Sequence, residues 1–515
     1  MTTQYIKKHF NLIPPTEDDA RSDRTRIADE LYDEFGNVEF SYDAVRMLYP
    51  LCREAEWDIT VTLVKKNGFY EVILVESGDT SAHCYAVAVD YGSTTVKSKL
   101  MDLATGQEVA SASCPNPQIE YGDEILSRIF YTKDNYEHLQ EIHSKTVNAL
   151  NTIMDLLEEK SGVSKKEYLG IAIGANTTMC HFIAGLFPWG IFETPYAPVS
   201  TEFDLIKAKD MGLDIPGYVY IAPSSANYLG GDIIGGLLTT DIEKEEGYSV
   251  FLDIGTNGEL VIGNSHFLVA GAGAAGPAFE VGVSKFGMKA EDGAVNHVKI
   301  EDGKINVEII GGVPAKGICG MGIVELLSEL FLNRFIDGTG TLHPEMSEDI
   351  ITIQNPDSGE DELAVIYAYE EDGDPIFFSQ TDIENFIQTK AAAHTMVASL
   401  LEYMHLTLND IHKFYLAGAF GTYVDLESAI TIGLYPDIPR DRYVALGNSS
   451  LEGAKRVLLD TESTVRMKYF TDNMTYVQFG EVAMFVQNMM AAQFLPHTDT
   501  NLYPTVMERY NKMNK

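Results

Sequence analysis

Two short stretches of the 515-residue chain place a carboxylate at the end of an apolar run and follow it with glycine and hydroxyl residues. A carboxylate there must be desolvated, so it suits a site that holds a divalent cation and its waters. Glycine lets backbone N–H groups approach a phosphate, and hydroxyls add neutral donors. The residues concerned are Asp90, Gly92, Ser93, Thr94 and Thr95 in the first stretch and Asp253, Gly255, Thr256, Asn257 and Gly258 in the second.

Taken alone, each stretch is also typical of an ordinary β-hairpin, and Asn257-Gly258 is a common hairpin dipeptide. The pair is more specific, because the two stretches resemble each other and a second pair of similar segments, residues 168–179 and 413–424, follows them in the same order. Two echoes indicate a duplicated α/β unit. Facing hairpins in two such halves can grip a triphosphate and its Mg²⁺, and the sequence contains no P-loop that would do so instead.

Small residues in two later segments predict the nucleoside part of the site. Residues 271–280 are almost all small, which lets main chain lie against a base or ribose, although a tight loop packed on the sheet is the alternative. Residues 417–425 read as a strand-to-helix turn with Asp425 as the helix N-cap. The positions expected to contact adenosine are Gly276, Gly418, Phe420 and Gly421.

Composition excludes several classes of protein. The chain has 37 Lys and Arg against 76 Asp and Glu, a net charge of −39, which disfavours binding to nucleic acid or anionic membranes. It has neither a signal-peptide pattern nor a run of about 20 apolar residues, so we expect a cytoplasmic protein.

The five cysteines predict no iron–sulfur ligands in this chain. They lie at least 30 residues apart and form no CxxC pair or ferredoxin-type ladder. One alternative stays open, in which Cys114 and Cys180 share a cluster with a second copy of the chain.

Polarity, turn residues and the alternation of expected strands and helices divide the sequence into four segments around these motifs. Residues 1–30 are polar and linker-like, and residues 31–82 read as a small α+β domain containing a hairpin at Asn67-Gly68. Gly-punctuated strands alternating with helices then predict a first lobe at 83–245 and a second lobe with C-terminal helices at 246–515.

These motifs make the chain resemble the ASKHA superfamily of acetate and sugar kinases, heat-shock chaperones and actin. More closely, it resembles the reductive activators of corrinoid proteins. The resemblance covers about 400 residues and rests on strings that include VDYGSTTV, NPQIEYGDEILSRI, GANTTM, DIGTNGEL, AAGPAFE, KGICGMGIVEL, LAGAFGTYVD and LGNSSLEGA. It implies an α/β protein with a duplicated actin-like ATPase fold, two lobes around a nucleotide cleft, preceded by a small α+β domain that matches the family's linker and middle domain.

The resemblance also implies an activity. ATP hydrolysis would drive one-electron reduction of a Co(II) corrinoid protein to Co(I), with ATP and Mg²⁺ as cofactors. Asp90 and Asp253 would orient Mg²⁺ through water, and either could orient the attacking water. Glu259 is a weaker candidate because it is expected to point along its strand.

Many members of that family carry an iron–sulfur domain that the sequence does not show. We therefore expect either a separate electron donor, ferredoxin-like or a flavoprotein, or a chain that has lost the redox role, with a homodimer left open. Two other functions on the same scaffold remain, a small-molecule kinase and a nucleotide-switched binding module. A kinase requires a small acceptor, an activator responds to its corrinoid partner, and a switch hydrolyses ATP negligibly.

Overall fold

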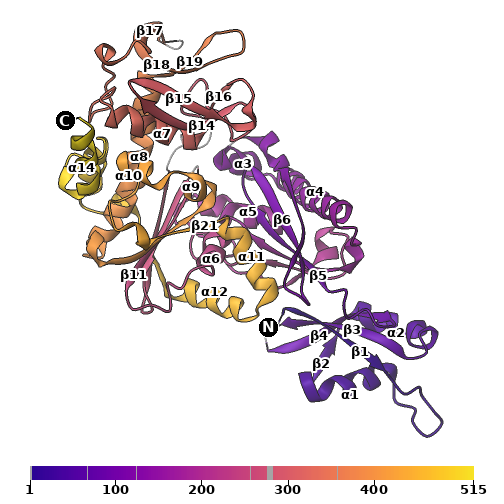
Figure 1. Ribbon diagram of the computed structural model, residues 1–515. Coiled ribbons are helices and arrows are strands. Elements are labelled where there is room, and N and C mark those ends of the chain that lie inside the picture. Colours follow the sequence, from indigo (N-terminus) through magenta and orange to yellow (C-terminus); the bar gives the residue numbers. More distant parts are fainter. Residues whose placement is uncertain are drawn as a thin grey trace. The chain divides into compact units, whose positions relative to one another are not determined.

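The computed structural model describes residues 3–66, 68–122, 124–255, 257–274, 282–355 and 358–514. The chain forms two compact units, each described below by itself (Figure 1). The first unit is Met1–Thr240 with Ser449–Asn473, and the second is Asp241–Asn448 with Met474–Lys515.

A small α+β domain opens the first unit. Its sheet has the order β1-β3-β4-β2 and is covered by two helices. The elements are β1 (Tyr5–Asn11), α1 (Asp23–Phe35), β2 (Val38–Phe40), α2 (Tyr42–Glu54), β3 (Asp58–Lys66) and β4 (Phe69–Ser77). The expected hairpin of β3 and β4 is present, and the N-terminal segment 1–30 contains a strand and the start of a helix. The strand forms because YIKKHFN pairs along its whole length with β3, from Tyr5 opposite Val64 onward.

Polar contacts join this small domain to the lobe that follows it within the first unit. The Tyr5 hydroxyl donates to the Tyr218 carbonyl at 3.3 Å, and the Tyr218 hydroxyl donates to the Glu71 carboxylate at 2.6 Å. Gly170 makes room for the Tyr5 ring, since a Cβ there would lie 2.0 Å from the Tyr5 hydroxyl. The small domain is therefore packed on the lobe rather than tethered to it.

The lobe of the first unit is built on a six-stranded sheet of order β7-β6-β5-β8-β10-β9. The central strand β5 pairs antiparallel with β6 on one side and parallel with β8 on the other. The strands are β5 (Tyr85–Tyr91), β6 (Thr95–Asp102), β7 (Glu108–Pro115), β8 (Tyr168–Gly174), β9 (Ile206–Lys207) and β10 (Tyr218–Ile221). The helices are α3 (Ile125–Thr132), α4 (Tyr136–Ser161), α5 (Thr177–Ala184), α6 (Gly231–Leu237), α11 (Ser449–Leu459) and α12 (Glu462–Asn473).

The second unit repeats this topology in a sheet of order β21-β20-β11-β12-β13-β22. Again the first strand, β11, is flanked by an antiparallel hairpin partner and by a parallel strand that comes much later in the chain. The strands are β11 (Tyr248–Ile254), β12 (Asn257–Gly263), β13 (Leu268–Ala274), β20 (Ile411–Ala417), β21 (Tyr443–Gly447) and β22 (Met474–Tyr476). The duplicated α/β fold predicted from the sequence echoes is confirmed.

Residues 449–473 belong to the first unit, although the sequence placed them in a second lobe running from 246 to 515. Helix α11 packs on β5, β8 and α6, all of the first unit. Gly453 allows this approach, because a Cβ there would lie 2.2 Å from the Gly235 carbonyl of α6. A linear reading of the chain cannot show such a return.

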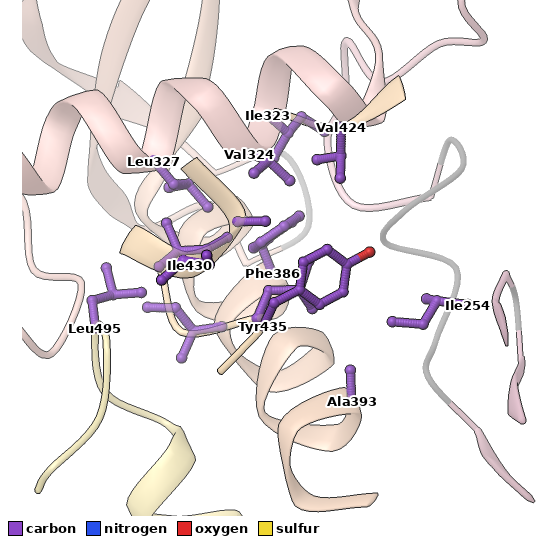
Figure 2. Packing of buried hydrophobic residues seen from close by; sticks show 14 of the residues in the cluster. Ile254, Ile323, Val324, Leu327, Phe386, Ala393, Val424, Ile430, Tyr435 and Leu495 are labelled. Atoms are coloured by element: carbon purple, nitrogen blue, oxygen red, sulfur yellow. The ribbon is translucent and has the colours of Figure 1, made fainter. Parts of the chain in front are cut away.

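An insertion between β13 and β20 supplies much of the core of the second unit. It contains two three-stranded sheets and two long helices, α7 (Gly320–Leu332) and α8 (Gln380–Tyr403). Figure 2 shows Ile254 of β11, Leu327 of α7 and Phe386 of α8 among the side chains of one buried cluster. The remaining elements are β14 (Ala294–Glu301), β15 (Lys304–Ile309), β16 (Gly317–Ile318), β17 (Ile350–Gln354), β18 (Asp361–Tyr369), β19 (Pro375–Ser379), α9 (Gly418–Tyr423), α10 (Leu426–Thr431), α13 (Phe485–Ala492) and α14 (Pro504–Met513).

Candidate functional site

The first acidic hairpin joins β5 to β6. Asp90 is the penultimate residue of β5 and is half-buried. It pairs in register with Lys97 of β6 and with Gly174 of β8. Residues directly opposite each other on a sheet point to the same face, so Lys97 emerges beside Asp90. The hairpin thus presents the Asp90 carboxylate and the Lys97 side chain together at the carboxyl end of the central strand.

The second hairpin joins β11 to β12 and places Asp253 at the corresponding position. Asp253 is also penultimate in its strand and pairs with Glu259 and with Ala417 of β20. Glu259 therefore leaves the sheet on the same face as Asp253, which removes the reason for ranking it lower. Because Gly258 pairs with Ile254, Asn257-Gly258 begins β12 and is not itself the turn.

A third carboxylate, which the sequence analysis missed, lies near Asp90. Asp232 is in the first turn of α6, and its backbone N–H donates to the Ala175 carbonyl at 3.1 Å. Burial raises the pKa of Asp232 to about 7, and the charge of Asp90 adds to that increase. Asp232 could have been noticed in the sequence because it is an acid within the glycine-rich run GGDIIGG. Such a run also predicts a helix that packs closely against neighbouring elements.

Lys97 is the other residue that the sequence analysis missed. The sequence signal was the alternation of side chains along β6. This alternation puts Lys97 on the same face of the sheet as Asp90. Its side chain is exposed, and no ion pair to it occurs among the described residues. Lys97 therefore offers an ammonium group that an anionic ligand could use.

The glycines proposed for adenosine binding lie in different surroundings. Gly276 and Thr256 are outside the described residues. Gly418 begins α9 with a φ of +79°, and a Cβ there would lie 2.7 Å from Oδ1 of Asp253. Gly421 packs against Leu416, and Phe420 is 9% exposed and belongs to the core of the second unit. The structure thus brings Gly418 to the acidic hairpin itself.

Two other expectations concern capping and cysteines. Asp425 is the N-cap of α10 and accepts a hydrogen bond from the Ser428 N–H at 2.7 Å, as predicted. Burial raises the pKa of the Cys84 and Cys180 thiols to about 12, so both are protonated near neutral pH. Cys319 is 2% exposed, and its thiol donates to the Val295 carbonyl at 3.4 Å.

The two sheets share one topology, and each has an acid as the penultimate residue of its central strand, which is the duplicated architecture of an ASKHA-type fold. Family models match the chain along nearly its whole length. Residues 247–507 match the C-terminal domain of RACo, the ASKHA domain, residues 85–245 match the RACo middle region, and residues 1–82 match the RACo linker region. The chain belongs to the RACo family of reductive activators of corrinoid proteins. The family's middle region therefore corresponds to the first lobe. It does not correspond to the small domain at 31–82, as the resemblance had implied.

Individual relatives agree with this assignment. A corrinoid activation enzyme, RamQ, of Eubacterium limosum is 28% identical over 423 residues, which are 81% of this chain and 71% of that protein. The [Co(II) methylated amine-specific corrinoid protein] reductase of Methanosarcina barkeri is 23% identical over 264 residues, 47% of this chain and 44% of that protein. A solved reductive activator for corrinoid, iron-sulfur protein is 33% identical with a TM-score of 0.88 and covers 98% of this chain and 81% of its own.

Two observations apply to the described part of the chain only. No helix there is long and apolar enough to cross a bilayer. No three His, Cys, Asp or Glu side chains within it gather into a group that could hold a metal ion directly.

Proposed function

We propose that this protein couples ATP hydrolysis to the one-electron reduction of a Co(II) corrinoid protein to Co(I). Membership of the RACo family carries the proposal, and the equivalent placement of Asp90 and Asp253 in two duplicated sheets supports it. For one electron, each ~59 mV of unfavourable potential corresponds to about 1.4 kcal/mol. In this proposal an ATP-driven conformational cycle supplies the free energy that offsets this unfavourable potential difference.

In this proposal each hairpin supplies groups that bind ATP. Asp90 and Asp253 hold Mg²⁺ through water molecules, and the bound cation offsets the phosphate charge. Lys97 adds an ammonium group on the side of Asp90, and Glu259 joins Asp253 as a candidate for orienting the attacking water. The phosphate-binding residues are Gly92, Ser93, Thr94, Thr95, Gly255, Thr256, Asn257 and Gly258, and the adenosine-binding residues are Gly276, Gly418, Phe420 and Gly421.

The reaction needs a partner and an electron source. We assign a corrinoid protein as the partner because the relatives are named for action on such proteins. The electron comes from a separate ferredoxin-like protein or flavoprotein, passes to Co(II), and leaves Co(I), while ATP and water yield ADP and phosphate.

The visible spectrum of a Co(II) corrinoid protein tests the proposal directly. The spectrum should change to that of Co(I) when this protein, ATP, Mg²⁺ and a reductant are all present, and should stay unchanged when ATP is omitted. ATP hydrolysis should rise when the Co(II) protein is added. Phosphorylation of a small acceptor without any response to the corrinoid protein would contradict the proposal and favour a kinase.

A further inference from the structure

The turn between β5 and β6 is held from behind by two buried side chains. Asn116 Nδ2 donates to the Gly92 carbonyl at 2.9 Å, and Arg128 Nη1 donates to the Ser93 carbonyl at 2.8 Å. The backbone N–H of Asn116 donates to the next carbonyl, that of Thr94, at 2.9 Å. Three successive carbonyls of the turn are thereby engaged from the same segment of the chain.

These bonds determine which way the N–H groups of the turn point. In a trans peptide the carbonyl and the following N–H point in opposite directions. Engaging the carbonyls of Gly92 and Ser93 therefore turns the N–H groups of Ser93 and Thr94 away from Asn116 and Arg128. Within the described residues, neither of these N–H groups has a hydrogen-bond partner. Adjacent free N–H groups in a turn form an anion-binding concavity.

The two supporting side chains are themselves firmly oriented. Asn116 is 1% exposed, and its Oδ1 accepts from the Gln118 N–H at 2.9 Å, which leaves Nδ2 as the donor to Gly92. Arg128 is fully buried, and its Nε donates to the Gly122 carbonyl at 2.8 Å. A guanidinium group stays charged in proteins, so this cation polarises the peptide between Ser93 and Thr94 and strengthens its N–H as a donor.

We propose that Asn116 and Arg128 are positioning residues that present the Ser93 and Thr94 N–H groups to a phosphate of ATP. This inference rests on the proposed function, because it assumes that ATP binds at the β5–β6 hairpin. It gives a role to the NPQIEYGDEILSRI segment, which otherwise enters only as a family resemblance. Arg128 acts through the peptide and does not touch the ligand.

The test compares affinities for ATP and for adenosine, measured by titration calorimetry on the full chain. Arg128→Met should weaken ATP binding about tenfold or more, the effect of losing a hydrogen bond to a charged group, while adenosine binding changes less than about twofold. Arg128→Lys, which keeps the charge, should lose less. Asn116→Leu should behave like Arg128→Met and covers the case in which that variant fails to fold.

Arg26→Met is the matched control. Arg26 is 4% exposed and donates to the Ile13 carbonyl at 3.1 Å, but it lies in the small domain. It should lower thermal stability without altering the ratio of ATP to adenosine affinity. Folded Arg128 and Asn116 variants with the wild-type ratio would overturn the positioning role. A wild-type protein that binds no ATP would instead contradict the proposed function itself.

Discussion

Single carboxylates at strand ends carry the proposed chemistry. Asp90 and Asp253 are each penultimate in a central strand, where burial is partial. Asp232, in the first turn of α6, has its pKa raised to about 7 by burial and by the charge of Asp90. Negative charge is therefore concentrated at a site that a bound cation would stabilise.

Asp253→Asn should reduce ATP turnover roughly a hundredfold, since the amide cannot supply the charge that stabilises a bound cation. The substitution is nearly isosteric at a half-buried position, so the protein should remain folded. Steady-state hydrolysis at saturating ATP and Mg²⁺ measures the effect. Asp425→Asn is the matched control, because Asn caps a helix as well as Asp and α10 should be unaffected. Unchanged turnover in Asp253→Asn would remove this residue from the site.

Asp232 should make the stability of the ligand-free protein depend on pH. Its pKa is raised from 3.8 to about 7, so between these values the folded state binds more protons than the unfolded state. Stability therefore falls as pH rises from about 4 to about 7 and then levels off. Asp232→Asn should match the wild type in thermal unfolding midpoint at low pH. At pH 8 the variant should be more stable than the wild type, by up to about 4 kcal/mol. A difference between the two that is independent of pH would contradict the raised pKa.

At the scale of elements, strand-to-helix junctions bring distant segments against the acidic hairpins. Helix α9 begins at Gly418, whose positive φ and missing Cβ let the main chain lie against Asp253. The following helix, α10, begins at its Asp425 cap. The junction after β20 thus both ends a strand and limits where the Asp253 carboxylate can lie.

Gly418→Ala should lower kcat and weaken ATP binding. Sequence reasoning predicts mainly the loss of affinity, but the added Cβ would meet Oδ1 of Asp253 at 2.7 Å and displace it. A displacement of this kind can reduce turnover roughly ten- to a hundredfold. Gly303→Ala is the matched control in the same unit, because its φ is +74° and nothing lies within 4 Å of the added Cβ. A normal kcat in Gly418→Ala, with only KM raised, would restore the adenosine assignment.

At the scale of the whole molecule, each unit is closed by chain segments that return from far along the sequence. Helix α11 completes the first unit, and the stretch after α13 completes the second. In the second unit Lys390 of α8 is fully buried and donates to the carbonyls of Ala492, Phe494 and Pro496 at 2.6, 2.6 and 2.7 Å. Burial lowers the pKa of Lys390, whereas the three carbonyl acceptors match the three hydrogens of an ammonium group and favour the charged form.

Lys390→Met should destabilise the second unit by about 3 kcal/mol or more, because three buried carbonyls lose their donor. Thermal unfolding and limited proteolysis after residue 490 measure the loss. Lys413→Met is the control, since Lys413 is half-buried and pairs with Glu245 near the surface. Such a pair contributes at most about 1 kcal/mol. Equal losses of stability in the two variants would contradict a stabilising role for the three hydrogen bonds of Lys390.

The sequence by itself determined the duplicated fold and the two acidic hairpins. Local patterns carry this information, because an apolar strand ending in Asp, Gly and hydroxyl residues is contiguous, and its echo can be found by spacing alone. The β3–β4 hairpin and the Asp425 cap were predicted for the same reason, since each depends on a few neighbouring residues.

Only the tertiary structure decided which distant residues meet these hairpins. Lys97 and Glu259 join the acids through strand register, and Asp232 lies near Asp90 because α6 follows a strand that runs parallel to β8. Asn116 and Arg128 reach the β5–β6 turn through carbonyl contacts that leave no trace in composition or periodicity. Packing of α11 on the first unit depends on two glycines more than 200 residues apart, Gly235 and Gly453. Long-range contacts are chosen by shape and hydrogen-bond satisfaction across the whole fold, and a local pattern cannot encode either.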